Sequence, residues 1–342
     1  MKLICLEEHV LDPTTAQASM PAALAAAPYL PDWGKTVRDG NNPDRSRPQV
    51  IANTDSTRKG MDWEGERLAD MDAAGITMQV LSLGGFPQYA PPADQPALSQ
   101  AVNDRLAATV AAHPDRFAAF ATLPWTRPDA AVKELERAVC QLDLKGALIN
   151  GRPGDTFLDA LEYADLLAAF NALQVPLYLH PGIPVPAVQA AYYSGFAPEL
   201  AARLPMFAWG WHNEAGIHLL RLILSGALDR NPQLQLISGH WGEMLPFWLQ
   251  RLDDSIPQAA SGLARSITDT FKAQVYVSPS GMLTRPHFNF IYELLGAERI
   301  LYSLDYPYQS LDGAHEFINA LPIADSEKAQ IAHGNAERLL RL

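Results

Sequence analysis

Cysteine is scarce in this sequence, with Cys5 and Cys140 as the two examples among 342 residues. Two cysteines in so long a chain do not make a disulfide framework of the kind that stabilises small secreted domains. Cys5 lies in a segment with the pattern of a strand, and Cys140 in one with the pattern of a helix. We therefore expect a protein of the reducing cytoplasm.

Long hydrophobic runs are also lacking. No apolar stretch approaches the ~18 residues that a membrane-spanning helix needs, and the Ala-rich run at 22–30 is followed by Pro31. Negative charge appears at Glu7, before any apolar region long enough for a signal peptide. We expect neither a membrane partner nor a secretion signal.

Positive charge is in deficit, because 26 Lys and Arg face 38 Asp and Glu and the formal net charge is -12. No run of Lys or Arg interrupts the acidic balance, so nucleic acid and anionic membrane surfaces are poor candidate partners. An anionic small substrate would need local positive charge, which a metal ion or a placed arginine could supply.

Short apolar segments recur between longer helical patterns. They are continuous rather than alternating, which is typical of parallel strands buried on both faces. The strand candidates are 3–6, 78–83, 117–123, 146–150, 176–180, 234–238, 275–278 and 300–304. Helical spacing of apolar residues lies between most of them, at 97–113, 130–142, 158–173 and 216–228.

This alternation predicts an α/β chain folded as a closed (β/α)8 barrel, with one domain over 1–342. An open, doubly wound sheet is the rival architecture, but no Gly-x-Gly-x-x-Gly follows the first strand. Residues 12–60 do not fit the alternation and are rich in Pro, Asn, Asp, Ala and Gly. We expect an insertion there, long enough to be a lid or a subunit contact.

Polar side chains gather where the predicted strands end, which in a (β/α)8 barrel is the rim that carries the chemistry. The strand ends are Glu7-Glu8-His9 for strand one, His180 for strand five, Gly239-His240 followed by Glu243 for strand six, and Asp305 for strand eight. Because successive side chains on a strand alternate, Glu7 and His9 can share the inward face while Glu8 points away.

Glu7, His9, His180 and Asp305 would bring two nitrogen and two oxygen ligands together. That set suits Zn²⁺, Mn²⁺ or Fe²⁺ better than Ca²⁺ or Mg²⁺. Each residue alone has a plainer interpretation, such as a structural histidine or an Asp that caps a helix. Their joint occurrence at one rim favours a mononuclear metal site.

Other polar residues are better explained without chemistry. His212 and His218 lie near the start and in the body of one predicted helix, where we expect packing or solvent contact. Arg251 follows Glu243 by eight residues, which is about two helical turns. Spacing alone favours an exposed helix charge, with Asp254 as its ion-pair partner.

Several segments resemble the amidohydrolase-related metalloenzymes that include the γ-resorcylate and dihydroxybenzoate decarboxylases. Among them are LEEHV (6–10), PLYLHPGIP (176–184), HLLRLILSGALDRNPQLQLISGHWGEMLPFWLQRLD (218–253) and LYSLDYPY (301–308). The resemblance covers nearly the whole chain apart from about 12–60. The stretches LEEH, YLHPGIP and GHWGE are most similar to the γ-resorcylate decarboxylase branch.

The resemblance implies a distorted (β/α)8 barrel with one divalent metal ion, Zn²⁺ or Mn²⁺, and no organic cofactor. It also implies a homo-oligomer, as a dimer or tetramer, and a small aromatic carboxylate as substrate. The implied metal ligands are Glu7, His9, His180 and Asp305, the implied acid/base pair is His240 and Glu243, and the implied substrate contacts are Arg251 for a carboxylate and Tyr308 for the ring.

The implied reaction is nonoxidative decarboxylation of a hydroxybenzoate. Asp305 would protonate the ring carbon that bears the carboxylate, and His240 and Glu243 would supply or relay that proton. The same ligands would also serve a hydrolase or hydratase acting on a lactone or enol acid, with Asp305 taking a proton from water. A metal-binding barrel without catalysis is the third alternative, and the His240 and Glu243 pair argues against it.

Overall fold

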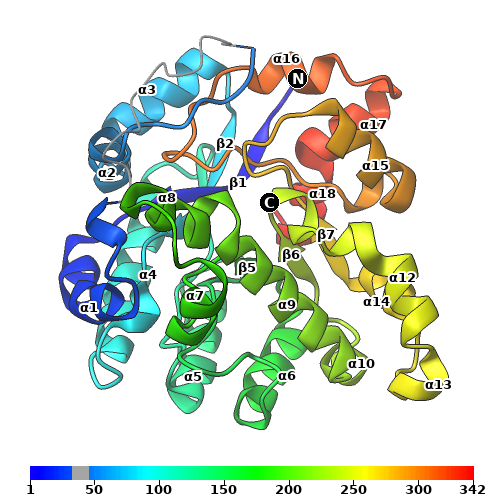
Figure 1. Cartoon of the computed structure of the whole chain (residues 1–342). Helices are drawn as coiled ribbons and strands as arrows, with labels where there is room; N and C mark the ends of the chain where they lie inside the picture. Colours follow the sequence, from blue (N-terminus) through cyan, green and yellow to red (C-terminus); the bar gives the residue numbers. More distant parts are fainter. Residues whose placement is uncertain (33–45) are drawn as a thin grey trace.

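The computed structural model describes residues 1–32 and 46–342 (Figure 1). Its strands are β1 (Ile4–Val10), β2 (Met78–Leu83), β3 (Phe117–Ala119), β4 (Ala147–Asn150), β5 (Leu177–His180), β6 (Leu236–Ser238) and β7 (Val275–Val277). They form two parallel sheets, β1-β2-β3 and β4-β5-β6-β7, and every strand residue is buried. The continuous apolar segments are therefore parallel strands covered on both faces, as predicted.

Isolated bridges and hydrogen bonds link the two sheets at both edges, as in a (β/α)8 barrel. Ala121, just after β3, pairs in parallel with Ala147 of β4. On the other side, Ile300 pairs with Val277 of β7, and the N–H of Leu6 in β1 donates to the carbonyl of Tyr302 at 2.9 Å. The predicted strand at 300–304 thus occupies the eighth position, although it lacks a regular ladder.

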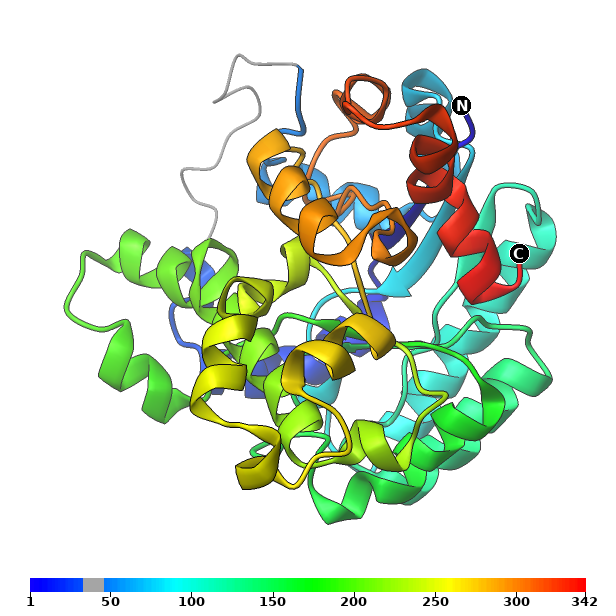
Figure 2. The same ribbon diagram turned by 90° about the vertical axis from the view of Figure 1, so that its right-hand side faces the viewer.

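Side chains fill the barrel interior, so it is a packed core and not a pore. The cluster comprises Ile4, Leu6, Met78, Val80, Ala118, Phe120, Leu148, Tyr178, Ile237, Tyr276 and Leu301, together with Ala336 and Leu340 of α18 (Asn335–Leu340). Helix α18 therefore closes the end of the barrel where the strands begin. Both chain ends lie on that side (Figure 2), where Lys2 pairs with Glu337 at 2.7 Å.

Helices cover the outside of the strands (Figure 1). The predicted ones are α4 (Gln95–Ala112), α5 (Pro128–Cys140), α6 (Ala164–Leu173), and α9 (Gly210–Leu224) with α10 (Ala227–Arg230). The others are α1 (Pro13–Ala26), α2 (Asn53–Met61), α3 (Gly65–Ala74), α7 (Pro186–Tyr192), α8 (Pro198–Arg203), α11 (His240–Glu243), α12 (Leu249–Ser255), α13 (Gln258–Ser261), α14 (Ile267–Gln274), α15 (Arg285–Leu295), α16 (Ala314–Asn319), α17 (Asp325–Ala329) and α18. Among the described residues, no helix combines the length and apolar character needed to cross a membrane.

The expected insertion at 12–60 contains α1 and α2, and its residues 33–45 lie outside the described part of the chain. Helix α1 starts where the Asp12 carboxylate accepts the N–H of Thr15 at 2.7 Å, a side-chain N-cap. The last part of the insertion runs beside the segment after strand eight, because the N–H of Ile51 donates to the carbonyl of Tyr308 at 2.9 Å. The insertion therefore reaches the rim of the barrel.

Candidate active site

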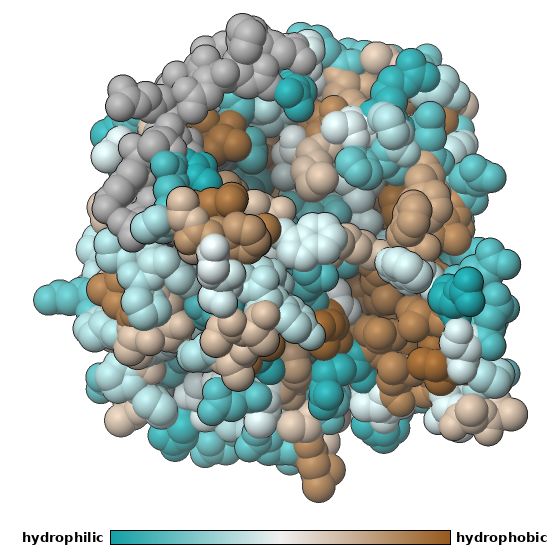
Figure 3. Space-filling view, in the orientation of Figure 1, coloured by the Kyte–Doolittle hydropathy of each residue, from teal (hydrophilic) through white to brown (hydrophobic). Residues whose placement is uncertain are grey.

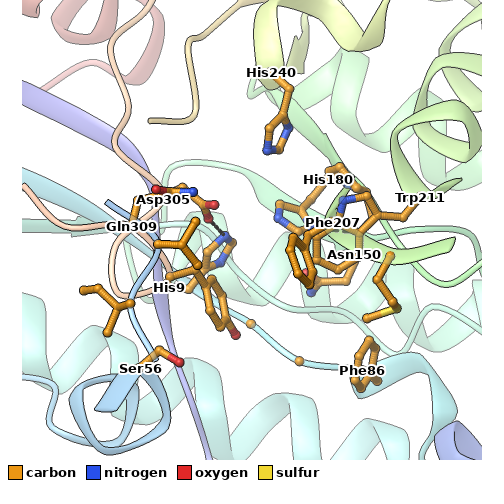
Figure 4. A pocket seen from close by; sticks show the side chains of 17 residues that line it. His9, Ser56, Phe86, Asn150, His180, Phe207, Trp211, His240, Asp305 and Gln309 are labelled. Carbon is orange, nitrogen blue, oxygen red and sulfur yellow. Dashed lines mark hydrogen bonds and ion pairs between the residues drawn. The ribbon is translucent and has the colours of Figure 1, made fainter. Parts of the chain in front are cut away.

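Four side chains from the carboxyl ends of three barrel strands converge at the rim, and Figure 4 labels three of them, His9, His180 and Asp305. One ligand atom from each of Glu7, His9, His180 and Asp305 lies within 4.8 Å of all the others. His9 Nε2 is 3.4 Å from Asp305 Oδ1, and His180 Nε2 is 3.7 Å from Glu7 Oε1. The structure thus brings together the four residues predicted as metal ligands.

A β-bulge at Glu7 gives β1 its two inward-facing ligands. Ile4 and Leu6 face the barrel interior, so simple alternation would place Glu8 inside next. The register with β2 shifts between Leu6 and Glu8, and Glu7 has a φ of 76°. The extra residue reverses the alternation, so Glu7 and His9 point into the site and Glu8 points away.

Hydroxyl groups orient the Glu7 carboxylate. Tyr178 donates to Oε2 at 2.6 Å, and Ser280 and Ser303 also donate to this oxygen. The other oxygen, Oε1, is buried without a hydrogen-bond partner and faces His180. Burial raises the pKa of Glu7, and the nearby Asp305 adds to that effect. A bound cation would offset both influences.

The two histidines are held with one nitrogen toward the centre of the cluster. His180 Nδ1 lies 2.8 Å from the carbonyl of Pro181 and donates to it, which leaves Nε2 as a lone-pair ligand. His9 Nδ1 pairs with Ser82 Oγ at 3.1 Å. Burial lowers the pKa of His180 well below its usual value, which keeps the ring neutral. Neutral imidazole is the form that binds metals.

Unpaired atoms are the observation that fits a metal ion to this site. Glu7 Oε1, His9 Nε2 and Asp305 Oδ1 are buried, and none has a hydrogen-bond partner. Buried polar atoms are normally paired, because an unpaired one carries a desolvation penalty. A divalent cation would satisfy all three at once, and the mixed nitrogen and oxygen set suits Zn²⁺ or Mn²⁺.

A left-handed turn at residues 240–244 builds a second polar cluster. Its φ angles lie between 48° and 89°, a conformation that L-residues avoid. Gly242 has the largest φ, and a Cβ there would lie 2.6 Å from Cγ of Pro246. The turn brings His240 Nδ1 to 2.7 Å from Glu243 Oε1, so the predicted pair is in direct contact.

His212 completes this cluster, although the sequence suggested only packing or solvent contact for it. Its Nδ1 lies 2.8 Å from Glu243 Oε2, so the carboxylate bridges two imidazoles. His212 Nε2 has both the indole N–H of Trp211 and the carbonyl of Phe207 at 3.0 Å. This nitrogen therefore has a hydrogen-bond partner whether it acts as donor or as acceptor.

The charges around His240 favour its protonated form. Burial alone would lower the pKa of His240, but Glu243, Glu7 and Asp305 together raise it to about 10. Burial would raise the pKa of Glu243, and the two imidazoles lower it instead. The pair is therefore an imidazolium beside a carboxylate at neutral pH.

A largely apolar pocket opens in front of both clusters (Figure 4). Its aromatic walls are Phe86, Phe207, Trp211 and Tyr308, and the remaining lining residues include Val50, Ile51, Ser56, Asn150, Met206, His240 and Gln309. The Tyr308 ring lies 5.5 Å from that of His9, so the residue predicted to contact a substrate ring does line the pocket. Val50, Ile51 and Ser56 come from the insertion.

The predicted carboxylate contact, Arg251, lies elsewhere. Helix α12 buries Leu249 against the core and leaves Arg251 exposed. Arg251 is not among the described residues that line the pocket of its own chain. The interpretation from helical spacing, an exposed helix charge, agrees with this placement. The contact with a substrate carboxylate that the family resemblance implies stays a prediction. His218 is buried on α9 and accepts the N–H of Leu158, as expected for a packing residue.

Comparisons with known proteins show the family to which this chain belongs. A family model described as Amidohydrolase matches residues 22–342. The chain is 36% identical over 354 residues to the γ-resorcylate decarboxylase of Rhizobium radiobacter, which covers 99% of this chain and 98% of the relative.

Solved structures of decarboxylases are similar over the whole chain. A 2,6-dihydroxybenzoate decarboxylase complexed with 2,6-dihydroxybenzoate has a TM-score of 0.84 and 31% identity, covering 100% of both chains. A dihydroxybenzoic acid decarboxylase from Polaromonas sp. JS666, with bound manganese and the inhibitor 2-nitroresorcinol, has a TM-score of 0.83 and 30% identity, covering 100% of this chain and 97% of that one.

The unpaired atoms predict that a divalent ion stabilises the fold. At free Mn²⁺ one hundred times above the dissociation constant, the gain is about 2.7 kcal/mol, which raises the melting temperature by several degrees. His180→Gln should abolish the rise. His218→Gln alters another buried histidine away from the cluster and should keep it. Differential scanning calorimetry measures these melting temperatures. Equal rises in the wild type and in His180→Gln would contradict the assignment.

Proposed function

Since this chain belongs to the amidohydrolase family, we propose that it is a metal-dependent decarboxylase of a hydroxybenzoate-type aromatic acid similar to γ-resorcylate. The observation that carries the proposal is the set of unpaired ligand atoms facing a pocket with aromatic walls. The decarboxylases that match over the full chain support this reaction over hydrolysis or hydration.

Glu7, His9, His180 and Asp305 would hold one divalent ion, Mn²⁺ or Zn²⁺. The manganese in the Polaromonas decarboxylase supports Mn²⁺ as the first ion to test. The ion would supply positive charge that binds substrate oxygens and stabilises negative charge on them. The proposed chemistry needs no organic cofactor, because a proton replaces CO₂ on the ring without net oxidation or reduction.

Asp305 is proposed as the acid that protonates the ring. It lies in the pocket wall beside His9, where a substrate ring would stack near Tyr308. It must carry a proton when the substrate is bound. That proton goes to the ring carbon bearing the carboxylate, the bond to the carboxyl carbon then breaks, and its electron pair restores the aromatic ring as CO₂ leaves.

His240 is proposed to supply or relay the proton. Its Nδ1 is engaged by Glu243, and its ring lines the pocket. The Glu243 carboxylate favours a proton on this ring, which a negatively charged group in the pocket could then take. Glu243 holds the ring in place, and His212 holds Glu243 from the other side.

The proton-transfer proposal predicts metal-dependent CO₂ release that requires Asp305. Mn²⁺-loaded protein should release CO₂ from 2,6-dihydroxybenzoate, with 2,3-dihydroxybenzoate, salicylate and 5-carboxyvanillate tested beside it. Asp305→Asn should abolish release because it removes the acidic proton. Folded protein with one ion per chain and no CO₂ from any of these acids would contradict the decarboxylase proposal and favour tests on lactones and enol acids.

The bridging contact predicts a graded effect at His212. His212→Leu removes the partner of Glu243 Oε2 and should lower kcat about tenfold, as expected for one lost charge-assisted hydrogen bond of about 1.5 kcal/mol. His212→Asn keeps an N–H donor close to the position of Nδ1 and should recover most of the activity. Equal losses in both variants, measured by steady-state kinetics, would argue against this positioning role.

An apolar surface supports assembly into a homo-oligomer, a dimer or tetramer. Phe247 and Trp248 are 74% and 56% exposed, just before α12. The Phe247 ring lies 5.6 Å from that of Phe290, which is also exposed. Figure 3 shows apolar surface on the side of the molecule that carries α12. Clusters of exposed aromatic side chains are typical of protein interfaces.

The aromatic surface predicts that polar substitutions dissociate the oligomer. The double variant Phe247→Ser with Trp248→Ser should elute as a monomer in size-exclusion chromatography with light scattering. Tyr192→Ser, at a residue 72% exposed on α7, is the matched control and should leave the assembly unchanged. A wild-type monomer, or an unchanged double variant, would refute this interface.

The two cysteines support a reducing compartment. Cys5 is buried and Cys140 is exposed, and both are free thiols. Exposed free thiols are usual in the cytoplasm and rare in secreted proteins. We propose that the enzyme works in the cytoplasm.

A further inference from the structure

Glu8 lies between two of the proposed metal ligands, yet its side chain points away from them. It is fully buried on the outer side of β1, between this strand and the eighth segment. Its Oε1 accepts the N–H of Leu304 at 2.9 Å, and its Oε2 accepts the N–H of Tyr306 at 3.3 Å. One carboxylate therefore holds the backbone on both sides of Asp305.

Two further buried side chains extend this contact to His9. Gln79 donates to Glu8 Oε2 at 3.3 Å, and Arg67 donates to Gln79 Oε1 at 2.9 Å. Arg67 also donates to the backbone carbonyl of His9 at 2.5 Å, and its guanidinium lies 4.7 Å from the ring centre of Tyr306. Arg67 and Gln79 are fully buried, so their contacts are shielded from bulk solvent.

We propose that Glu8 is a positioning residue for the metal centre, which it serves by clamping the Asp305 segment to the end of β1 through a network with Gln79 and Arg67. The inference rests on the proposed metal site and assigns Glu8 a function that its side chain performs without touching the ion. Its effect is to fix the spacing between Asp305 and the pair Glu7 and His9.

Backbone geometry explains why a clamp is needed at this point. Glu7 has a φ of 76° and Asp305 a φ of 62°, so a ligand on each side of the seam is in the left-handed region. Such conformations persist when the surrounding structure determines them. The eighth segment lacks a regular ladder, and the N–H of Leu304 goes to Glu8 instead of to a neighbouring strand. Glu8 thus replaces ladder hydrogen bonds where the chain must bend to present Asp305.

A second buried carboxylate, Glu134, serves as a control that distinguishes a positioning role from a general effect on stability. Glu134 is 3% exposed, pairs with Arg137 at 2.8 Å and accepts from Asn103 at 2.7 Å. It resembles Glu8 in burial and in its arginine and amide neighbours, but it lies on α5. Loss of Glu134 should lower stability without moving the metal ligands.

The test measures Mn²⁺ affinity of the full-length protein by competition with a fluorescent chelator. Glu8→Gln keeps the side-chain volume but places an amide N–H next to the N–H groups that the carboxylate accepts. It should weaken Mn²⁺ binding by about 10- to 100-fold, as loss of groups that orient metal ligands typically does. Glu134→Gln should bind as the wild type does. Adding Arg67→Met to Glu8→Gln removes the unpaired buried cation, so this double variant should recover thermal stability and still bind weakly.

The possible results distinguish a failure of the Glu8 clamp from a failure of the proposed metal site. Wild-type affinity in Glu8→Gln, or in the double variant, would overturn the clamp. So would an equal loss of affinity in Glu134→Gln, because stability alone would then explain the effect. A wild-type protein that binds neither Mn²⁺ nor Zn²⁺ would overturn the metal centre itself.

Discussion

The bulge in β1 is the constraint on which the site depends. The barrel core needs Ile4 and Leu6 inside, and the site needs Glu7 and His9 inside, which a regular strand cannot provide over this spacing. One extra residue resolves the conflict by reversing the alternation after Leu6. The same reversal sends Glu8 outward, where it meets the segment that carries Asp305.

Four acidic side chains are concentrated at this rim, and each is compensated differently. Glu7 is held by three hydroxyls, and Glu243 by two imidazoles. Glu8 accepts backbone N–H groups and is linked through an amide to a buried arginine. One oxygen each of Glu7 and Asp305 has no hydrogen-bond partner; Glu7 Oε1 faces His180, and Asp305 Oδ1 faces His9. The unpaired charge is thus confined to the place where a cation would bind.

The two polar clusters are built on different kinds of backbone, one on regular strands and the other on a strained turn. Short parallel strands place His9 and His180 with one nitrogen tied to a neighbouring group, which orients each ring. The left-handed turn at 240–244 instead brings His240 and Glu243 into contact, which a right-handed turn would arrange differently. Strain of this kind is common at functional sites because the surrounding structure holds it. Here Ser280 accepts the N–H of His240 at 2.8 Å and helps to hold the turn.

Local patterns in the sequence determined the strand order, most of the helices and the polar residues at the strand ends, because burial on both faces and helical periodicity are written in neighbouring residues. They also identified the four candidate ligands, since parallel strands in a barrel bring their carboxyl ends to one rim. Tertiary structure alone decided the bulge at Glu7, the contact of His212 with Glu243 and the clamp made by Glu8. Each of these depends on which distant segments meet: α9 against the turn after β6, or the eighth segment against β1. Such contacts join residues 31 or 296 positions apart, and no local spacing encodes them.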